Sequence, residues 1–129
     1  MLYEELGPVG IRAVFEALTD LDYQHVKQIC IWKCFAEDEG VRSICNYIKK
    51  NPNVQKLDLL ENNITLLGCQ FLTRVLMPDS QLLKLKLDHN NFGDAGLKNL
   101  ASALAVNNTL EKLSLNYCGI TKEGSRYIQ

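Results

Sequence analysis

The sequence predicts an α/β solenoid, a horseshoe segment with parallel β-strands on its concave face and helices on its convex face. Three observations predict this fold. Glycines recur at a step of 28 residues (68−40, 96−68 and 124−96), at Gly40, Gly68, Gly96 and Gly124. Large apolar residues keep the same step, at Ile29, Leu57, Leu85 and Leu113. Within each unit the apolar spacing changes from that of a strand to that of a helix, and a fixed period of this length is typical of a solenoid.

The composition fits one ordinary globular domain. The chain has 129 residues, of which 47% are hydrophobic and 22% are charged, as is typical of globular proteins. A net charge of −1 gives no overall attraction to nucleic acid or to anionic membranes. No apolar run approaches the ~20 residues that a membrane span needs. The five cysteines, an odd number, and an acidic N-terminus without the form of a signal peptide favour a cytoplasmic location.

The first half of each unit has the pattern of a short strand. In the second unit Val54, Leu57 and Leu59 hold the apolar positions, and residues two apart on a strand point to the same face. A tight turn must follow, and its backbone polar groups need partners. The turn carries Asn or Cys in every unit, at Cys34, Asn62, Asn90 and Cys118. We expect these side chains to face inward and bond to a neighbouring turn.

The second half of each unit has the pattern of a helix. In the third unit Leu97, Leu100 and Leu104 recur at helical spacing. Residues that favour helix starts precede each helix, and we predict as N-caps Asp38, Thr65, Asp94 and Thr121. The helices are predicted to end near 49–52, 77–78 and 106–108. The recurring glycine at each helix start indicates close backbone approach between adjacent turns, where a side chain would not fit.

A single repeat domain is therefore predicted over 1–129. It contains full repeats at 26–53, 54–81 and 82–109 and a partial repeat at 110–129. Residues 1–25 form a partial repeat or an N-terminal cap helix, because only a helix half is present there. The turn of the first full repeat carries Trp32 and Phe35 and is expected to be modified. Both ends fall inside a repeat, which favours a fragment of a longer array over a complete small protein capped by its first helix.

These residues match a known pattern. The form LxxLxLxxNxI is met at 54–64 and 82–92, and at 110–120 with Cys118 in the Asn place. The chain resembles leucine-rich repeat proteins, and the 28-residue repeat with its long helix resembles the ribonuclease-inhibitor subtype, which NOD-like receptors and Ran GTPase-activating proteins also carry. The resemblance covers about residues 10–129. It implies a protein-binding role, commonly on the concave strand face, without naming a partner.

A column of lysines on that face is the first candidate site. Lys56, Lys84 and Lys112 share one outward position, and Lys86 lies beside them. One interpretation is a recess for acidic groups on a protein partner. The other is a solvated face, in which Asp58 lies opposite Lys86 and pairable charges form a row at Lys33, Glu61 and His89.

The second candidate is an apolar anchor, Trp32 beside Leu60, on a face otherwise polar. The alternative is that the irregular N-terminal part folds over Trp32. Together with one further aromatic residue, the predicted protein-binding residues are Trp32, Lys56, Leu60, Lys84, Lys86, Lys112 and Tyr117.

The sequence offers no pattern of catalytic or cofactor-binding residues. Cys30 and Cys34 are expected to face opposite ways, so no metal site is predicted. Every arginine is expected on a helix, away from the strand-to-helix corners: Arg12, Arg42, Arg74 and Arg126. The predicted function is a non-enzymatic protein-protein interaction module without a nucleic-acid or membrane partner. The alternatives are a GTPase-activating regulator resembling the Ran activators and a structural part of a cytoskeletal or ciliary assembly. Unpaired strand edges also predict weak end-to-end self-association.

Overall fold

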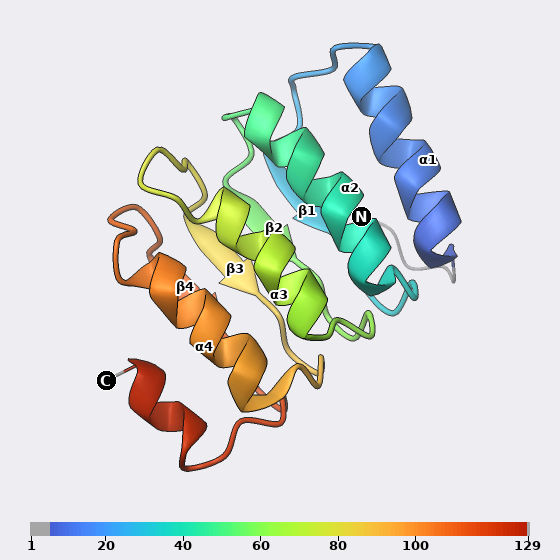
Figure 1. Ribbon diagram of the computed structural model, residues 1–129. Helices are drawn as coiled ribbons and strands as arrows, with labels where there is room; N and C mark the ends of the chain where they lie inside the picture. The colour runs from blue at the N-terminus through green and yellow to red at the C-terminus, as the bar shows by residue number, and fades with distance from the viewer. Residues whose placement is uncertain (1–5, 129) are drawn as a thin grey trace.

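The computed structural model describes residues 6–128, which form a two-layer solenoid (Figure 1). Its elements are, in chain order, α1 (Gly7–Asp20), β1 (Gln28–Cys30), α2 (Glu37–Lys50), β2 (Lys56–Asp58), α3 (Leu66–Leu72), the 3-10 turn η1 (Thr73–Val75), β3 (Lys84–Lys86), α4 (Gly93–Leu104), β4 (Lys112–Ser114) and the 3-10 helix η2 (Gly124–Ile128). The helices lie side by side over one face of the strands. Among residues 6–128, no helix is both long and apolar enough to cross a membrane.

The strands form one parallel sheet in the order β1-β2-β3-β4. The register keeps the step of the sequence, because Leu57 pairs with Ile29 on one side and Leu85 on the other, and Leu85 pairs with Leu113. Leu57 and Leu85 are fully buried, and Leu113 is partly buried against the same core. The predicted fold class is therefore confirmed. We name each coil by the strand with which it begins.

Helix α1 covers the core next to the β1 coil. Ile11 and Phe15 are buried, and the ring of Phe15 lies edge-on to Tyr47 of α2, with 5.6 Å between ring centroids. The Tyr47 hydroxyl donates to the carbonyl of Tyr23 at 2.5 Å, which holds the connection after α1. Burial raises the pKa of Tyr47. Helix α1 thus shields the end of the core.

The predicted helix ends hold for two of the three helices. Helices α2 and α4 end at Lys50 and Leu104, close to the expected positions. Helix α3 ends at Leu72 and continues as the 3-10 turn η1. The hydroxyl of Thr73 donates to the carbonyl of Gln70 at 2.6 Å, a local bond that competes with regular helix. The second repeat therefore has the shortest α-helix.

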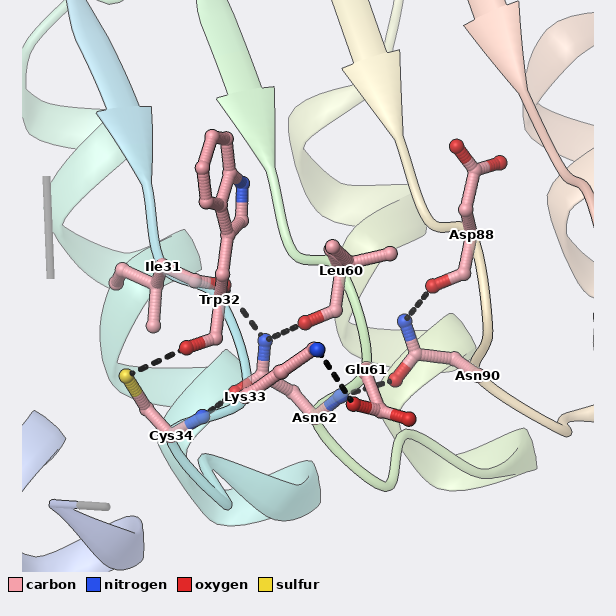
Figure 2. Close-up of polar contacts among 9 residues, drawn as sticks. All are labelled: Ile31, Trp32, Lys33, Cys34, Leu60, Glu61, Asn62, Asp88 and Asn90. Carbon is pink, nitrogen blue, oxygen red and sulfur yellow. Dashed lines mark hydrogen bonds and ion pairs between the residues drawn. The ribbon is translucent and has the colours of Figure 1, made fainter. Parts of the chain in front are cut away.

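An asparagine ladder closes the turns after the strands (Figure 2). The Oδ1 atom of Asn62 accepts from the backbone amides of Cys34 at 3.1 Å and Ala36 at 3.3 Å. Its Nδ2 donates to the carbonyls of Ile31 at 2.7 Å and Leu60 at 3.1 Å. Asn62 is fully buried, so it satisfies backbone groups of the preceding coil that water cannot reach.

Asn90 repeats this arrangement one coil later. It accepts from the amides of Asn62 at 2.8 Å and Ile64 at 3.1 Å, and it donates to the carbonyl of Leu59 at 2.8 Å. Cys118 makes a weaker contact, because its thiol donates to the carbonyl of Leu87 at 3.1 Å. The expectation that these side chains face inward and bond to a neighbouring turn is confirmed for Asn62, Asn90 and Cys118. Cys34 is also buried, and its thiol donates to the carbonyl of Trp32 in its own turn.

The capping prediction is wrong for the two aspartates. Asp38 and Asp94 lie inside α2 and α4, and neither makes a cap hydrogen bond to its own helix. Asp38 instead reaches the next coil, where its Oδ1 accepts from the amides of Thr65 at 2.8 Å and Gly68 at 2.9 Å. The Thr65 hydroxyl donates to the other carboxylate oxygen. An aspartate thus caps the helix of the following coil.

These aspartate bridges also correct the reason given for the glycines. A Cβ on Gly68 would lie 2.5 Å from Asp38 Oδ1, and one on Gly124 would overlap the carboxylate of Asp94. The group that approaches is therefore a neighbour's carboxylate and not its backbone. At Gly96 a Cβ would instead meet Phe92 of the same coil, at 2.6 Å.

Candidate protein-binding surface

The register aligns the outward side chains of the strands into rows. Lys56 pairs with Lys84, and Lys84 pairs with Lys112. We call these three residues the lysine row. Lys84 and Lys112 are exposed and Lys56 is half-buried. Neighbouring strands lie about 4.8 Å apart, so the row places like charges at that spacing across three strands.

The lysine row forms no ion pair with the acidic residues that the structure describes. Over residues 6–128, no ion pair includes Lys56, Lys84 or Lys112. Like charges directly opposite on adjacent strands are mildly destabilising. The row therefore presents positive charge that an outside carboxylate would compensate.

Two neighbouring charge pairs are internal, as the solvated-face interpretation predicts. Lys86 Nζ lies 3.9 Å from Asp58 Oδ2, and the Asp58 side chain is only 6% exposed. Lys33 Nζ lies 3.9 Å from Glu61 Oε2, with both side chains about half exposed. Lys86, one of the predicted contact residues, is thus partnered within the chain.

His89 departs from the predicted row of charges. Its ring stacks on Tyr117, with 4.7 Å between centroids and 21° between planes, and the structure shows this contact in place of a pair with Glu61. Tyr117 is 79% exposed. The stack forms an aromatic rim beside the ends of β3 and β4.

Trp32 and Leu60 hold equivalent positions just after β1 and β2, and both are half-buried (Figure 2). The turns beneath them fix their backbones, because Cys34 Sγ donates to the carbonyl of Trp32 at 3.2 Å and Asn62 Nδ2 donates to that of Leu60. The structure therefore lies between the two interpretations of Trp32: part of the side chain is covered and part is open to solvent.

A left-handed residue follows in every coil, which the sequence reasoning missed. The positions are Lys33, Glu61, His89 and Tyr117, with φ of 55°, 53°, 60° and 59°. None is glycine, and such φ values are uncommon for other residues. They turn the chain away from the sheet and set these four side chains on one exposed rim. Their spacing of 28 was visible, but their residue types share nothing that signals the conformation.

Phe35 is a further surface residue that the site prediction omitted. It is 46% exposed and has a φ of 52°. The equivalent positions of the later coils are Asn63, Asn91 and Gly119, residues that suit turns. An aromatic side chain at a turn position was the available signal.

The cysteines and arginines offer no visible chemistry. Burial raises the pKa of Cys45 and of Cys69 to about 12, so both are thiols rather than thiolates at neutral pH. The arginines occupy helical segments, as predicted: Arg12, Arg42, Arg74 and Arg126. Within the described part of the chain, no cluster of three or more His, Cys, Asp or Glu could hold a metal ion.

Comparison with known proteins finds relatives that include NACHT, LRR and PYD domains-containing proteins and ribonuclease inhibitors. The chain is 37% identical to NACHT, LRR and PYD domains-containing protein 14 of Mus musculus over 86 residues, 65% of this chain and 9% of that protein. It is 30% identical to NACHT, LRR and PYD domains-containing protein 5 of Bos taurus over 125 residues, 95% of this chain and 11% of that protein. It is 24% identical to ribonuclease inhibitor of Mus musculus over 150 residues, 93% of this chain and 33% of that protein. The chain spans about a third or less of these relatives.

The repeat pattern of the family described as Leucine Rich repeat matches residues 50–72, 80–101 and 106–128, more than half of the chain. The single parallel sheet, the aligned leucines and the asparagine ladder agree with this match. The chain belongs to the leucine-rich repeat family, and its relatives place it with the ribonuclease-inhibitor type.

Proposed function

We propose that this chain is a non-enzymatic module that binds a protein on its concave strand face. The contact surface comprises the lysine row, the Trp32–Leu60 pair and Tyr117. Family membership supports a binding role, and one relative is by name an inhibitor of a ribonuclease. Because the chain covers so little of its relatives, the larger activities of those proteins are not transferred to it.

The observation that carries the proposal is the exposure of large side chains on the strand face. Tyr117 is 79% exposed on the β4 coil, and Trp32 and Leu60 are half-buried on the β1 and β2 coils. Exposed aromatic residues beside charged ones are typical of interface centres, where Trp and Tyr contribute most of the binding energy. A reducing cytoplasm fits an odd number of cysteines, five in this chain, and we propose that location.

Photo-crosslinking tests which face meets the partner. Tyr117→p-benzoylphenylalanine puts a crosslinker on the strand face, and Ser102→p-benzoylphenylalanine puts one at an exposed position of α4. We expect a defined protein adduct in cell extract from the first position alone. Adducts from the α4 position alone, or equally from both, would contradict the proposal.

Trp32→Ala gives a second test. With the crosslinked partner in hand, calorimetric titration should show binding weakened by more than about 2 kcal/mol. Circular dichroism and thermal unfolding check that the variant keeps its fold. An unchanged affinity in a folded variant would remove Trp32 from the contact surface.

A further inference from the structure

The strand face divides into two zones at opposite ends of the strands. The lysine row holds the first positions of β2, β3 and β4. The apolar and aromatic residues Trp32, Leu60 and Tyr117 come just after the strands end. Leu60 lies four positions after Lys56, about 13 Å along an extended chain. A partner must therefore offer carboxylates along one edge and apolar groups along the other.

Two acidic residues of this face have partners inside the chain: Asp58 lies between the zones, and Asp88 lies in the second zone, at the position on the β3 coil equivalent to Leu60. Asp58 pairs with Lys86. The Oδ1 atom of Asp88 accepts from the Ser114 hydroxyl at 2.7 Å and from the amide of Asn116 at 2.8 Å. A partner therefore meets uncompensated positive charge mainly at the lysine row. Its carboxylates are directed there, and the Asp88 charge disfavours the reversed orientation.

The spacing of the row distinguishes between partner conformations. With lysines on three successive strands, the second and third lie about 4.8 and 9.6 Å from the first. On a helix, residues i+3 or i+4 and i+7 lie about 4.5–6 and 10.5 Å along the axis from residue i. On an extended segment, residues on one face lie about 6.6 and 13 Å from the first. The helical spacing matches the row and the extended spacing does not.

The width of the face agrees with the same partner. A helix with its side chains is about 10–12 Å across, close to the separation of the two zones along the strands. Laid across the strands, such a helix covers β1 to β4, about 14 Å, in roughly ten residues. Its two edges then fall on the lysine row and on the apolar zone.

We propose that the strand face binds an acidic amphipathic α-helix of a partner protein, which lies across the four strands. Carboxylates at i, i+3 or i+4, and i+7 face Lys56, Lys84 and Lys112, and apolar side chains contact Trp32, Leu60 and Tyr117. This inference rests on the proposed function, since it specifies the partner of the same surface.

The test uses two synthetic peptides of roughly 15 residues, about four helical turns. One carries Glu at i, i+4 and i+7 with a stripe of Leu along the adjacent face. The other has the same composition with Glu at i, i+2 and i+4. Fluorescence anisotropy with the 129-residue chain should show the helical pattern bound about tenfold more tightly. Binding should weaken between ~50 and ~200 mM salt, because screening reduces the attraction of exposed charges.

Charge reversal makes the test specific. Lys84→Glu should weaken binding of the helical peptide about tenfold, and a peptide with the central Glu changed to Lys should recover it. Lys98→Glu makes the same charge change on α4, on the helix face, and should leave binding within about twofold. Equal binding of the two peptides, no binding of either, or no effect of Lys84→Glu would each overturn the inference. Crosslinking at Tyr117 that persists after such a failure would leave the proposed function standing.

Discussion

The junction between the β1 and β2 coils differs from the junction between the β2 and β3 coils. At the first, Asp38 bridges to the amides of Thr65 and Gly68. At the second, the position equivalent to Asp38 is Leu66, which is 37% exposed, and Gly93 takes the place of Thr65. The junction between the β3 and β4 coils is bridged again, by Asp94 to Thr121.

This difference shows that apolar and polar periods need not coincide. The leucines repeat every 28 residues, whereas the aspartate bridges repeat after 56 (94−38). The backbone follows the longer period, because Glu37 and Gly93 have left-handed φ of 56° and 70° whereas Thr65 has a φ of −112°. The amides of these left-handed residues donate to the next coil, at the carbonyls of Asn62 and Cys118. The asparagine ladder, the strand pairing and the packing of adjacent helices are common to the first two junctions.

The largest effect is expected from Asn90→Ala. This change removes the asparagine ladder between the β2 and β3 coils, where Leu66 stands at the position equivalent to Asp38. Asn90 is fully buried and bonds to backbone groups of two coils. Each buried group left without a partner costs ~1–3 kcal/mol, so the free energy of unfolding should fall by about 4 kcal/mol in urea titrations. The exposed Asn108→Ala serves as control, with a change within about 0.5 kcal/mol.

Asn62→Ala sharpens the comparison, because its junction keeps the Asp38 bridge. Its cost should be smaller than that of Asn90→Ala, by about 1 kcal/mol, the typical contribution of a helix cap. If Asn62→Ala destabilises the chain as much as Asn90→Ala, the bridge does not compensate for the loss of the ladder at its junction.

Asp38→Ala removes the bridge itself. The amides of Thr65 and Gly68 lose their acceptor, and the free energy of unfolding should fall by about 1–2 kcal/mol. Asp38→Asn keeps an acceptor oxygen, so it should lose less than half of the free energy of unfolding that Asp38→Ala loses. Denaturant titration of both variants separates the contribution of the acceptor oxygen from that of the negative charge. If the asparagine variant is as unstable as the alanine variant, the charge carries the stabilisation.

The second bridge predicts a dependence on pH. Hydrogen bonds from the hydroxyl and amide of Thr121, and from the amide of Gly124, lower the pKa of Asp94. A folded pKa below the unfolded value means that the stabilisation is complete above the unfolded pKa, about 3.9. It is lost as the pH falls through the lower, folded pKa. Thermal unfolding should therefore show the wild-type chain losing stability more steeply below about pH 4 than Asp94→Asn; parallel curves would contradict this.

The smallest effect is expected from Leu66→Asp, which puts an aspartate at the junction that lacks one. The donors that such a carboxylate needs are missing, because Gly93 has no hydroxyl and its amide already donates to the carbonyl of Cys118 at 3.0 Å. Stability should change by no more than about 0.5 kcal/mol, as is usual at the surface. Stabilisation by more than about 1 kcal/mol would show that the aspartate alone makes a bridge.

The fold could be predicted because its signals are periodic and local. Leu57, Leu85 and the asparagines repeat at one step, and stacking follows from the step. The role of Asp38 could not be predicted from local capping rules, since its partners Thr65 and Gly68 lie 27 and 30 residues away. A search for Asp followed by Thr and Gly at those distances would have found both bridges.

On the candidate surface, the contacts that follow from the strand register could be predicted, and those that depend on the backbone of the turns could not. The lysine row and the pair of Lys86 with Asp58 follow from the register alone. The stack of His89 on Tyr117 depends on left-handed backbone in two successive coils, which no residue type there signals. The partial burial of Trp32 depends on packing in the irregular first turn, and periodicity carries no information about it.

Both the bridges and the lysine row require equivalent side chains to align from coil to coil, and methyl-labelled NMR measures this directly. Nuclear Overhauser effects should connect the Leu57 methyls to those of Leu85, and the Leu85 methyls to those of Leu113, following the strand register. Contacts of Leu85 with neither leucine would show that the coils do not stack in register and would contradict the account.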